Sequence, residues 1–166
     1  MKYFYGLTSF AMLREIVYAV CDVLGRGAGD KAAILMLETA AQETRCGTYK
    51  DPTPYGAGAG VFQCDLIAFQ DVQQRCPVSA YRRVSDEFGI DLKKAKHEQL
   101  LYSPLLAAIV CRIHYLLCVE PIPQNEHGRA EYWKRFYNSS LGKGTPLEYL
   151  AHTAIIQQLQ EDEASV

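Results

Sequence analysis

The sequence predicts a mainly α-helical protein in a single domain. Apolar residues recur at helical spacing through most of the chain, no stretch of any length is typical of β-strands, and glycine or proline separates one helical segment from the next. The 166 residues match the usual length of one domain, and no internal repeat divides them. We therefore expect one domain over residues 1–166, with a polar C-terminal tail from about residue 158.

The first part of the chain contains two predicted helices and a loop. The first helix ends at Gly25 and Gly27, and its apolar face consists of Leu13, Ile16, Val17, Val20 and Leu24. Asp30 is placed to cap a second helix, which continues to about Thr44. Residues 47–60 contain two prolines and a run of glycine and alanine, so this segment is predicted to be a loop.

The remainder of the chain contains five more predicted helices. They cover residues 66–74, 78–88, 104–118, 129–137 and a segment from about 146 into the acidic tail. Gly89 is placed to end the second of these helices, and Ser103-Pro104 is a typical start for the third. Two prolines within residues 120–123 favour an extended connection before the fourth.

The charge and hydropathy of the chain exclude two broad classes. The formal net charge is −2 and the seventeen basic residues are scattered, whereas a general nucleic-acid binder carries a basic excess or stripe. No apolar run approaches the length of a membrane span, and no signal peptide is recognisable at the N-terminus. We expect synthesis in a cytoplasm, with another agent carrying the protein to any target outside.

The sequence gives no support for a metal or cofactor. The six cysteines contain no Cys-x-x-Cys pair and are expected to be mostly buried, reduced residues. His97-Glu98 lacks the second histidine of a zincin, and neither Gly56–Gly60 nor Gly142–Thr145 has the pattern of a phosphate-binding loop.

Glu43 is the leading candidate for a catalytic acid. It falls in the last turn of a predicted buried helix, just before a glycine-bearing loop. Cleavage of a glycosidic bond requires a carboxylic acid that an apolar pocket keeps protonated near neutral pH. Glu38 lies on the same helix about 140° away, so both side chains cannot face one cleft, and Glu38 is expected to be a solvated surface carboxylate.

Four short motifs make the chain resemble the lysozyme-like superfamily, in particular its goose-type and lytic transglycosylase members. In order they are Gln42-Glu43-Thr44, Gly60-Val61-Phe62-Gln63, Ile113-His114-Tyr115-Leu116, and Tyr137-Asn138 followed by Gly142-Lys143-Gly144. They correspond to the catalytic Glu with its hydroxyl neighbour, the Gly-x-x-Gln element, the aromatic-leucine helix and the Tyr-Asn element of that family. The resemblance implies a lysozyme-like fold and cleavage of peptidoglycan.

Two longer runs resemble small lysozyme-like proteins of tailed phages. The first run is residues 39–44, and the second is residues 130–138 together with residues 141–145. The resemblance implies a phage protein that acts on the host cell wall, carried in the virion for genome entry or released at lysis, with the virion route favoured. Its expected partners are bacterial peptidoglycan and other virion proteins.

The resemblance also implies roles for individual residues. Glu43 would protonate the oxygen between two amino sugars, and Tyr137 would hold Glu43 through a hydrogen bond. The substrate-binding residues would be Thr44, Gly60, Gln63 and Asn138, with the glycines allowing close approach of the backbone to sugar.

Aromatic residues near these motifs are candidates for stacking on sugar faces. They are Tyr55, Tyr132 and Trp133, although packing in the core is the favoured interpretation for Trp133.

A lysozyme of the two-carboxylate type is an alternative to a transglycosylase, and it requires a second carboxylate besides Glu43. Asp51 and Asp65 are the candidates, and capping of the following helix is the favoured role for Asp65. Many of the phage proteins that the chain resembles carry Met-Glu after the glutamine, where this chain has Cys64-Asp65. This departure leaves open which carboxylate would assist.

Two other functions are compatible with the sequence. The first is a virion structural or assembly protein that kept a lysozyme-like fold and little activity, because fold does not determine function. A cysteine peptidoglycan endopeptidase is a lesser alternative, with Cys64 at a predicted helix start and His114, His127 or His152 as its partner.

Overall fold

The computed structural model of the chain describes residues 1–52, 58–138 and 142–165. It is mainly helical, as the sequence predicts. The α-helices of the described residues are α1 (Phe10–Leu24), α2 (Lys31–Thr44), α3 (Leu66–Arg75), α4 (Val78–Phe88), α5 (Pro104–Leu116), α6 (Glu126–Trp133) and α7 (Pro146–Ala164). Short 3₁₀ helices form at Ala28–Asp30 and His97–Leu101, and a π-helical segment, Lys134–Asn138, continues α6.

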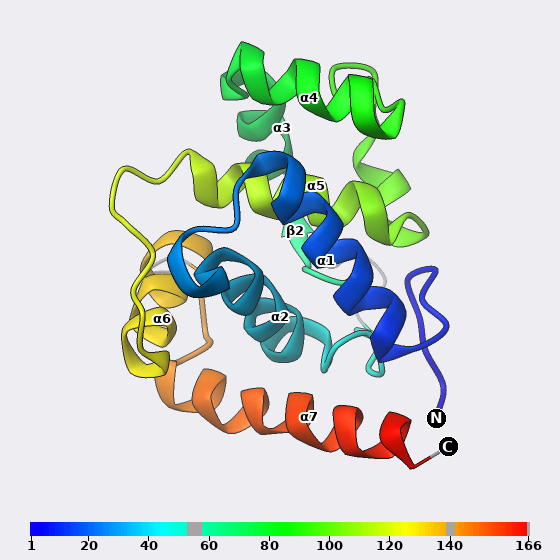
Figure 1. Cartoon of the computed structure of the whole chain (residues 1–166), viewed down its shortest axis with the longest axis vertical. Coiled ribbons are helices and arrows are strands. Elements are labelled where there is room, and N and C mark those ends of the chain that lie inside the picture. Colours follow the sequence, from blue (N-terminus) through cyan, green and yellow to red (C-terminus); the bar gives the residue numbers. More distant parts are fainter. Residues whose placement is uncertain (53–57, 139–141, 166) are drawn as a thin grey trace.

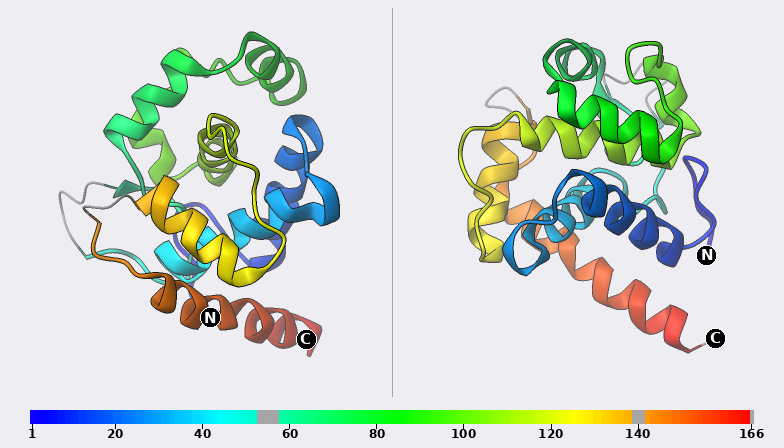
Figure 2. Two further views of the ribbon diagram at one scale, coloured as in Figure 1. Left: turned by 90° about the vertical axis from the view of Figure 1, so that its left-hand side faces the viewer. Right: turned by 45° about the horizontal axis from the view of Figure 1, so that its top comes forward.

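Helix α5 is the centre of the fold. Figure 2 shows it end-on in its left view, with the other helices around it, and Figure 1 shows α1 crossing in front of it. Its side chains are buried from Leu106 to Ile113 because most of them are apolar. The charged member, Arg112, donates a 3.0 Å hydrogen bond to the Gly25 carbonyl oxygen. Helix α1 packs along α5, while α7 lies at the edge of the molecule against α2 and α6.

The only strands in the described residues are β1 (Gly58–Ala59) and β2 (Cys64–Asp65), which form an antiparallel hairpin. Gly58 pairs with Asp65, and Ala59 pairs with Cys64. A side chain at position 58 would place its Cβ 2.5 Å from the Gln63 carbonyl oxygen, so this tight turn requires glycine. The hairpin joins the predicted loop to the start of α3.

The predicted helix boundaries are confirmed for α4 and for the start of α5, whereas the helix predicted over residues 129–137 begins earlier, at Glu126. Helix α4 covers Val78–Phe88, and Gly89 follows it with a φ of 66°. The Ser103 hydroxyl accepts a hydrogen bond from the Leu106 amide, and Pro104 occupies the first turn of α5. The prediction that Asp30 caps α2 with its side chain is wrong, because Asp30 has left-handed backbone angles and makes no capping bond.

The polar C-terminal segment continues the last helix. Thr145 and Glu148 form a capping box at the start of α7, and the helix runs through the acidic residues to Ala164. Leu159 is buried, and the Glu163 carboxylate accepts a hydrogen bond of 2.7 Å from the Ala11 amide in the first turn of α1. This contact places the two ends of the described chain near each other, as Figure 1 shows.

Glu38 is buried, so its predicted place on the solvated surface is wrong. Its two carboxylate oxygens accept hydrogen bonds of 2.6 and 2.7 Å from the Arg129 guanidinium, and one also accepts a 3.0 Å bond from the Tyr149 hydroxyl. The exposed fractions are 5% for Glu38 and 7% for Arg129. Helix α7 covers this face of α2, and the three side chains join α2, α6 and α7.

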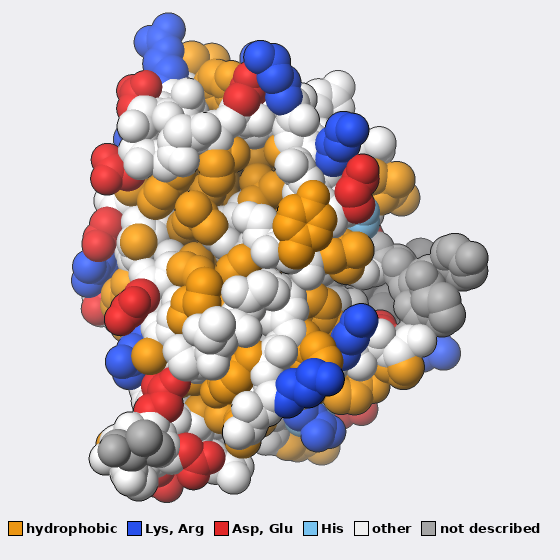
Figure 3. Space-filling model, turned by 90° about the vertical axis from the view of Figure 1, so that its right-hand side faces the viewer, with side chains coloured by type: hydrophobic (Ala, Val, Ile, Leu, Met, Phe, Trp, Pro, Cys, Tyr) orange, Lys and Arg blue, Asp and Glu red, His pale blue; other side chains and the backbone are white. Residues whose placement is uncertain are grey.

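The six cysteines are free thiols, and four of them are buried as expected: Cys21, Cys46, Cys64 and Cys111. On the face shown in Figure 3, hydrophobic side chains gather in the centre, with charged side chains of both signs along the borders. Among the described residues, no helix has the length and apolar character needed to cross a membrane.

Breaking the buried ion pair is expected to destabilise the protein. Arg129→Met leaves the Glu38 carboxylate buried without its cation, which should lower the free energy of unfolding by about 3 kcal/mol. Urea denaturation measures this value, and Arg82→Met, at an exposed arginine on α4, serves as the control. Equal stability of the two variants would contradict a structural role for the pair.

Candidate active site around Glu43

Glu43 lies in the last turn of α2, at a helix end that is held firmly in place. Arg45, which follows the helix, has left-handed backbone angles, and its amide donates to the carbonyl oxygens of Ala40 and Ala41. The buried Thr44 hydroxyl donates a 2.7 Å hydrogen bond to the Val61 carbonyl oxygen and accepts one from the Gly47 amide. These bonds fix the loop beyond α2 and with it the position of Glu43.

The Glu43 side chain lines a pocket of about 140 Å³. The hairpin, the start of α3, helix α5 and the π-helical segment surround it. Its lining consists of Glu43, Gly58, Gln63, Cys64, Asp65, Ala68, His114, Tyr137 and Asn138. The pocket therefore brings together residues from all four sequence motifs.

The surroundings of Glu43 favour its neutral form. Burial raises the pKa of its carboxyl from an ordinary value of 4.5 to about 7, and the Trp133 hydrogen bond partly opposes this rise. The Trp133 indole Nε1–H donates to a carboxylate oxygen at 3.0 Å, and no charged side chain contributes to the shift. A carboxyl with this pKa can give and take a proton near neutral pH.

Trp133, not Tyr137, holds the Glu43 carboxyl. The prediction that Tyr137 holds Glu43 through a hydrogen bond is wrong, because the Tyr137 hydroxyl donates to the Phe62 carbonyl oxygen at 2.7 Å. The Tyr137 ring stacks on Tyr115 with its centroid 5.4 Å away. Tyr137 thus lines the pocket and fixes the backbone of the Gly60–Gln63 motif.

Gln63 and Asn138 remain candidates for binding substrate. Gln63 lines the Glu43 pocket as well as a depression of about 770 Å³ beside it, which also shares Gly58. Its side-chain amide donates to the Gly60 carbonyl oxygen at 2.8 Å, which leaves its oxygen available as an acceptor within the described residues. Asn138 also lines the pocket, and its side-chain oxygen accepts a hydrogen bond from Lys134.

Thr44 and Gly60 stabilise the fold and do not reach the pocket. Thr44 has no exposed surface, so its predicted contact with substrate is wrong. A Cβ at Gly60 would lie 2.5 Å from the Leu100 carbonyl oxygen, and its φ is 76°. The close approach that requires glycine at this position is therefore to the Leu100 backbone, not to a sugar. Tyr55 lies outside the described residues.

Tyr132 and Trp133 have no ring face available for a sugar. Trp133 is fully buried, which confirms core packing as its favoured role, and its ring packs on Tyr149 at 5.2 Å. Tyr132 is 5% exposed, so its predicted stacking role is wrong.

Two carboxylates lie near the site. Asp65 caps α3 by accepting a 2.7 Å hydrogen bond from the Ala68 amide, which confirms its favoured role. It also lines the Glu43 pocket, where it is the second carboxylate among the described residues. Asp51 lines the adjoining depression together with Tyr5 and Glu98.

The Cys64 thiol has the properties of a buried structural residue. Burial raises its pKa to about 12, so the thiol is protonated at neutral pH and is a weak nucleophile. His114 Nε2 bonds the Phe136 carbonyl oxygen, His152 bonds Gln42, and His127 is exposed on α6. These observations argue against the cysteine endopeptidase alternative.

The sequence patterns did not predict that Trp133 bonds Glu43 or that His114 lines the Glu43 pocket. The signal available for Trp133 was its spacing of four residues from Tyr137, which places the two side chains on one side of a helix. Among the described residues, no group of His, Cys, Asp and Glu side chains is arranged to hold a metal ion. Comparisons with protein families, curated proteins and solved structures found no match to this chain.

The raised pKa of Glu43 predicts a pH-dependent loss of stability. Below about pH 4.5 the carboxyl is protonated in the folded and unfolded chains, whereas above about pH 7 the folded chain must hold a buried carboxylate. Glu43→Gln should therefore raise the free energy of unfolding at pH 8 by about 1–2 kcal/mol, less than the full shift because the side chain is partly exposed. At pH 4 the variant and the wild type should be equally stable in urea denaturation. A difference that is the same at both pH values would refute this explanation.

The indole donor predicts a further rise of the Glu43 pKa when it is removed. Trp133→Phe deletes the N–H that stabilises the carboxylate, so the pKa should rise above about 7 in a ¹³C NMR titration of Glu43. Tyr137→Phe is the matched control, because its hydroxyl bonds Phe62 and should leave the Glu43 pKa close to that of the wild type. The reverse pattern would show that Tyr137 is the residue that holds Glu43.

Proposed function

We propose that this protein has a lysozyme-like fold and cleaves the bond between N-acetylmuramic acid and N-acetylglucosamine in peptidoglycan, as a lytic transglycosylase of phage type. The observation that carries the proposal is the Glu43 carboxyl in a pocket at the end of a buried helix, with its pKa raised to about 7. The order of the four motifs along the chain supports the same assignment.

The proposed reaction uses one carboxyl group as acid and then as base. The Glu43 proton passes to the bridging oxygen as the bond from that oxygen to C1 of the muramyl sugar breaks, and the acetamido group of the sugar stabilises the positive charge at C1. The Glu43 carboxylate then takes the proton of the sugar's own 6-hydroxyl while O6 bonds to C1. The products are a chain end with a free 4-hydroxyl and a 1,6-anhydro sugar, and no water is consumed.

The pocket and its neighbouring depression together provide room for the glycan strand. Ligand pockets usually enclose roughly 300–1,000 Å³, more than the Glu43 pocket alone. The adjoining depression of about 770 Å³ shares Gly58 and Gln63 with it, so we place the strand across both, with the side-chain amide of Gln63 between them.

A lysozyme reaction is the second candidate, and Asp65 is the observation that favours it. Its carboxyl lines the Glu43 pocket, where it would stabilise the charged sugar or orient a water molecule. We favour the transglycosylase because the Asp65 side chain is already bonded to the Ala68 amide as a helix cap. We further propose that the protein is synthesised in the host cytoplasm, is carried in the virion with other virion proteins, and opens the wall during genome entry.

Digestion of purified peptidoglycan tests the proposed reaction. The wild type should release anhydro-muramyl products, detected by mass spectrometry, at a rate that falls as the pH rises through about 7 and Glu43 loses its proton. Glu43→Gln should lower the rate by at least about a hundredfold.

Each alternative has its own product. Reducing sugar ends that depend on Asp65 would indicate a lysozyme, and cleavage of peptide bonds would indicate the cysteine endopeptidase that uses Cys64. Intact peptidoglycan after treatment with wild type at several pH values would overturn the enzymatic proposal in favour of the virion structural protein.

A further inference from the structure

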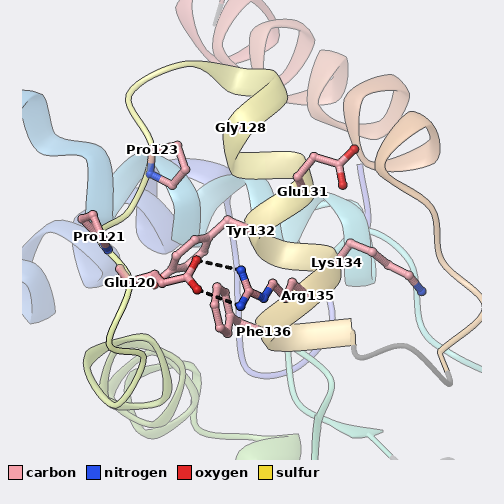
Figure 4. A pocket seen from close by; sticks show the side chains of 9 residues that line it. All are labelled: Glu120, Pro121, Pro123, Gly128, Glu131, Tyr132, Lys134, Arg135 and Phe136. Carbon is pink, nitrogen blue, oxygen red and sulfur yellow. Dashed lines mark hydrogen bonds and ion pairs between the residues drawn. The ribbon is translucent and has the colours of Figure 1, made fainter.

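A second, larger groove lies on the side of α6 away from Trp133. Its volume is about 930 Å³, and it runs between α6 with its π-helical continuation and the connection that follows α5. Figure 4 shows Pro121 and Pro123 on the wall formed by the connection, with Tyr132 and Phe136 on the wall formed by the helix. Neither the sequence motifs nor the proposed reaction uses this groove.

An ion pair crosses the groove from one wall to the other. The Arg135 guanidinium forms two parallel contacts with the Glu120 carboxylate, of 2.9 and 2.7 Å, which Figure 4 marks with dashed lines. Both side chains are exposed, at 64% for Arg135 and 48% for Glu120. Since exposed pairs are weak, a ligand that offers its own carboxylate and ammonium groups can replace each partner.

The aromatic side chains of the groove are not arranged to stack on a sugar. The Arg135 guanidinium covers the Phe136 ring at 4.8 Å from its centroid. The Tyr132 ring is buried, and its hydroxyl donates to the Glu120 carbonyl oxygen. The groove thus offers apolar walls and charged side chains of both signs, which suits a short zwitterionic peptide better than a neutral sugar. The charged side chains are those of Glu120, Glu131, Lys134 and Arg135.

Shared lining residues connect this groove to the Glu43 pocket. A third depression, of about 330 Å³, shares Glu120 and Phe136 with the groove and shares His114 with the Glu43 pocket. It is also lined by a second exposed ion pair, between Arg75 and Asp71 at 2.9 Å. The three depressions follow the end of α5 and the π-helical segment.

We propose that this groove binds the short peptide attached to the muramyl sugar of the glycan strand, with Arg135 taking a peptide carboxylate and Glu120 a peptide ammonium group. The inference rests on the proposed function, because it specifies the peptide-bearing form of the same substrate. A strand that places its reacting sugar at Glu43 extends its peptide past His114 toward Arg135.

The test compares peptide-bearing glycan strands with the same strands after an amidase has removed their peptides. Wild type should cleave the peptide-bearing strands about threefold faster, the effect of one exposed charge pair, and Arg135→Gln should reduce this ratio to about one. Arg82→Gln, at an exposed arginine on α4, is the matched control and should keep the wild-type ratio. Because Arg135 is exposed, its substitution should leave the thermal melting of the protein unchanged.

A binding measurement separates failure of this inference from failure of the proposed function. The free tetrapeptide of peptidoglycan is titrated into Glu43→Gln, and the NMR signals of the Arg135 guanidinium and the Phe136 amide are followed. Shifts of both signals support the peptide site if the Phe136 amide no longer shifts once Arg135→Gln is added. This result holds even if the wild type cleaves no strand and the proposed reaction fails. Equal cleavage of both substrates without such shifts would overturn the proposed peptide site and would still support cleavage of the glycosidic bond.

Discussion

The site depends on the buried ion pair between Glu38 and Arg129, because this pair sets α2 against α6. Arg129 lies one helical turn before Trp133, and Glu38 lies five residues before Glu43 on the facing helix. Once the charged pair fixes the distance and rotation of the two helices, the Trp133 indole meets the Glu43 carboxyl at 3.0 Å. Tyr149 adds α7 to the same interaction and excludes water from it.

Helix α2 therefore carries two carboxylates in opposite electrostatic settings. Glu38 faces a guanidinium and a phenol, and its hydrogen bonds raise the pKa of Arg129, so the guanidinium keeps its charge in the interior. Glu43 faces one neutral donor in a pocket without a cation, and burial there raises its pKa. The first arrangement stabilises the assembly of the helices, whereas the second makes a proton available at the surface of the pocket.

Local sequence signals were sufficient to predict the helices and the position of Glu43. The burial of Glu38 and the hydrogen-bond partner of Glu43 depend on contacts between residues far apart in the sequence. Gly89, Ser103 and Pro104 act through their own backbone or the next turn, so the sequence is sufficient to place the boundaries of α4 and α5. The burial of Glu38 depends on Arg129, 91 residues away, and no local pattern contains that information. Trp133 and Tyr137 were interchanged for the same reason, since choosing between two aromatic side chains requires the packing of α6 against α2.

The π-helical segment Lys134–Asn138 makes the site sensitive to the loss or gain of a single residue. A π turn holds one residue more than an α turn, so the side chains beyond it are rotated by about 100° relative to an uninterrupted α-helix. Loss of a single residue here would leave Trp133 on Glu43 but turn Asn138 away from the pocket. An insertion or deletion of one residue in this segment would therefore change which side chains line the pocket while Glu43 stays in place.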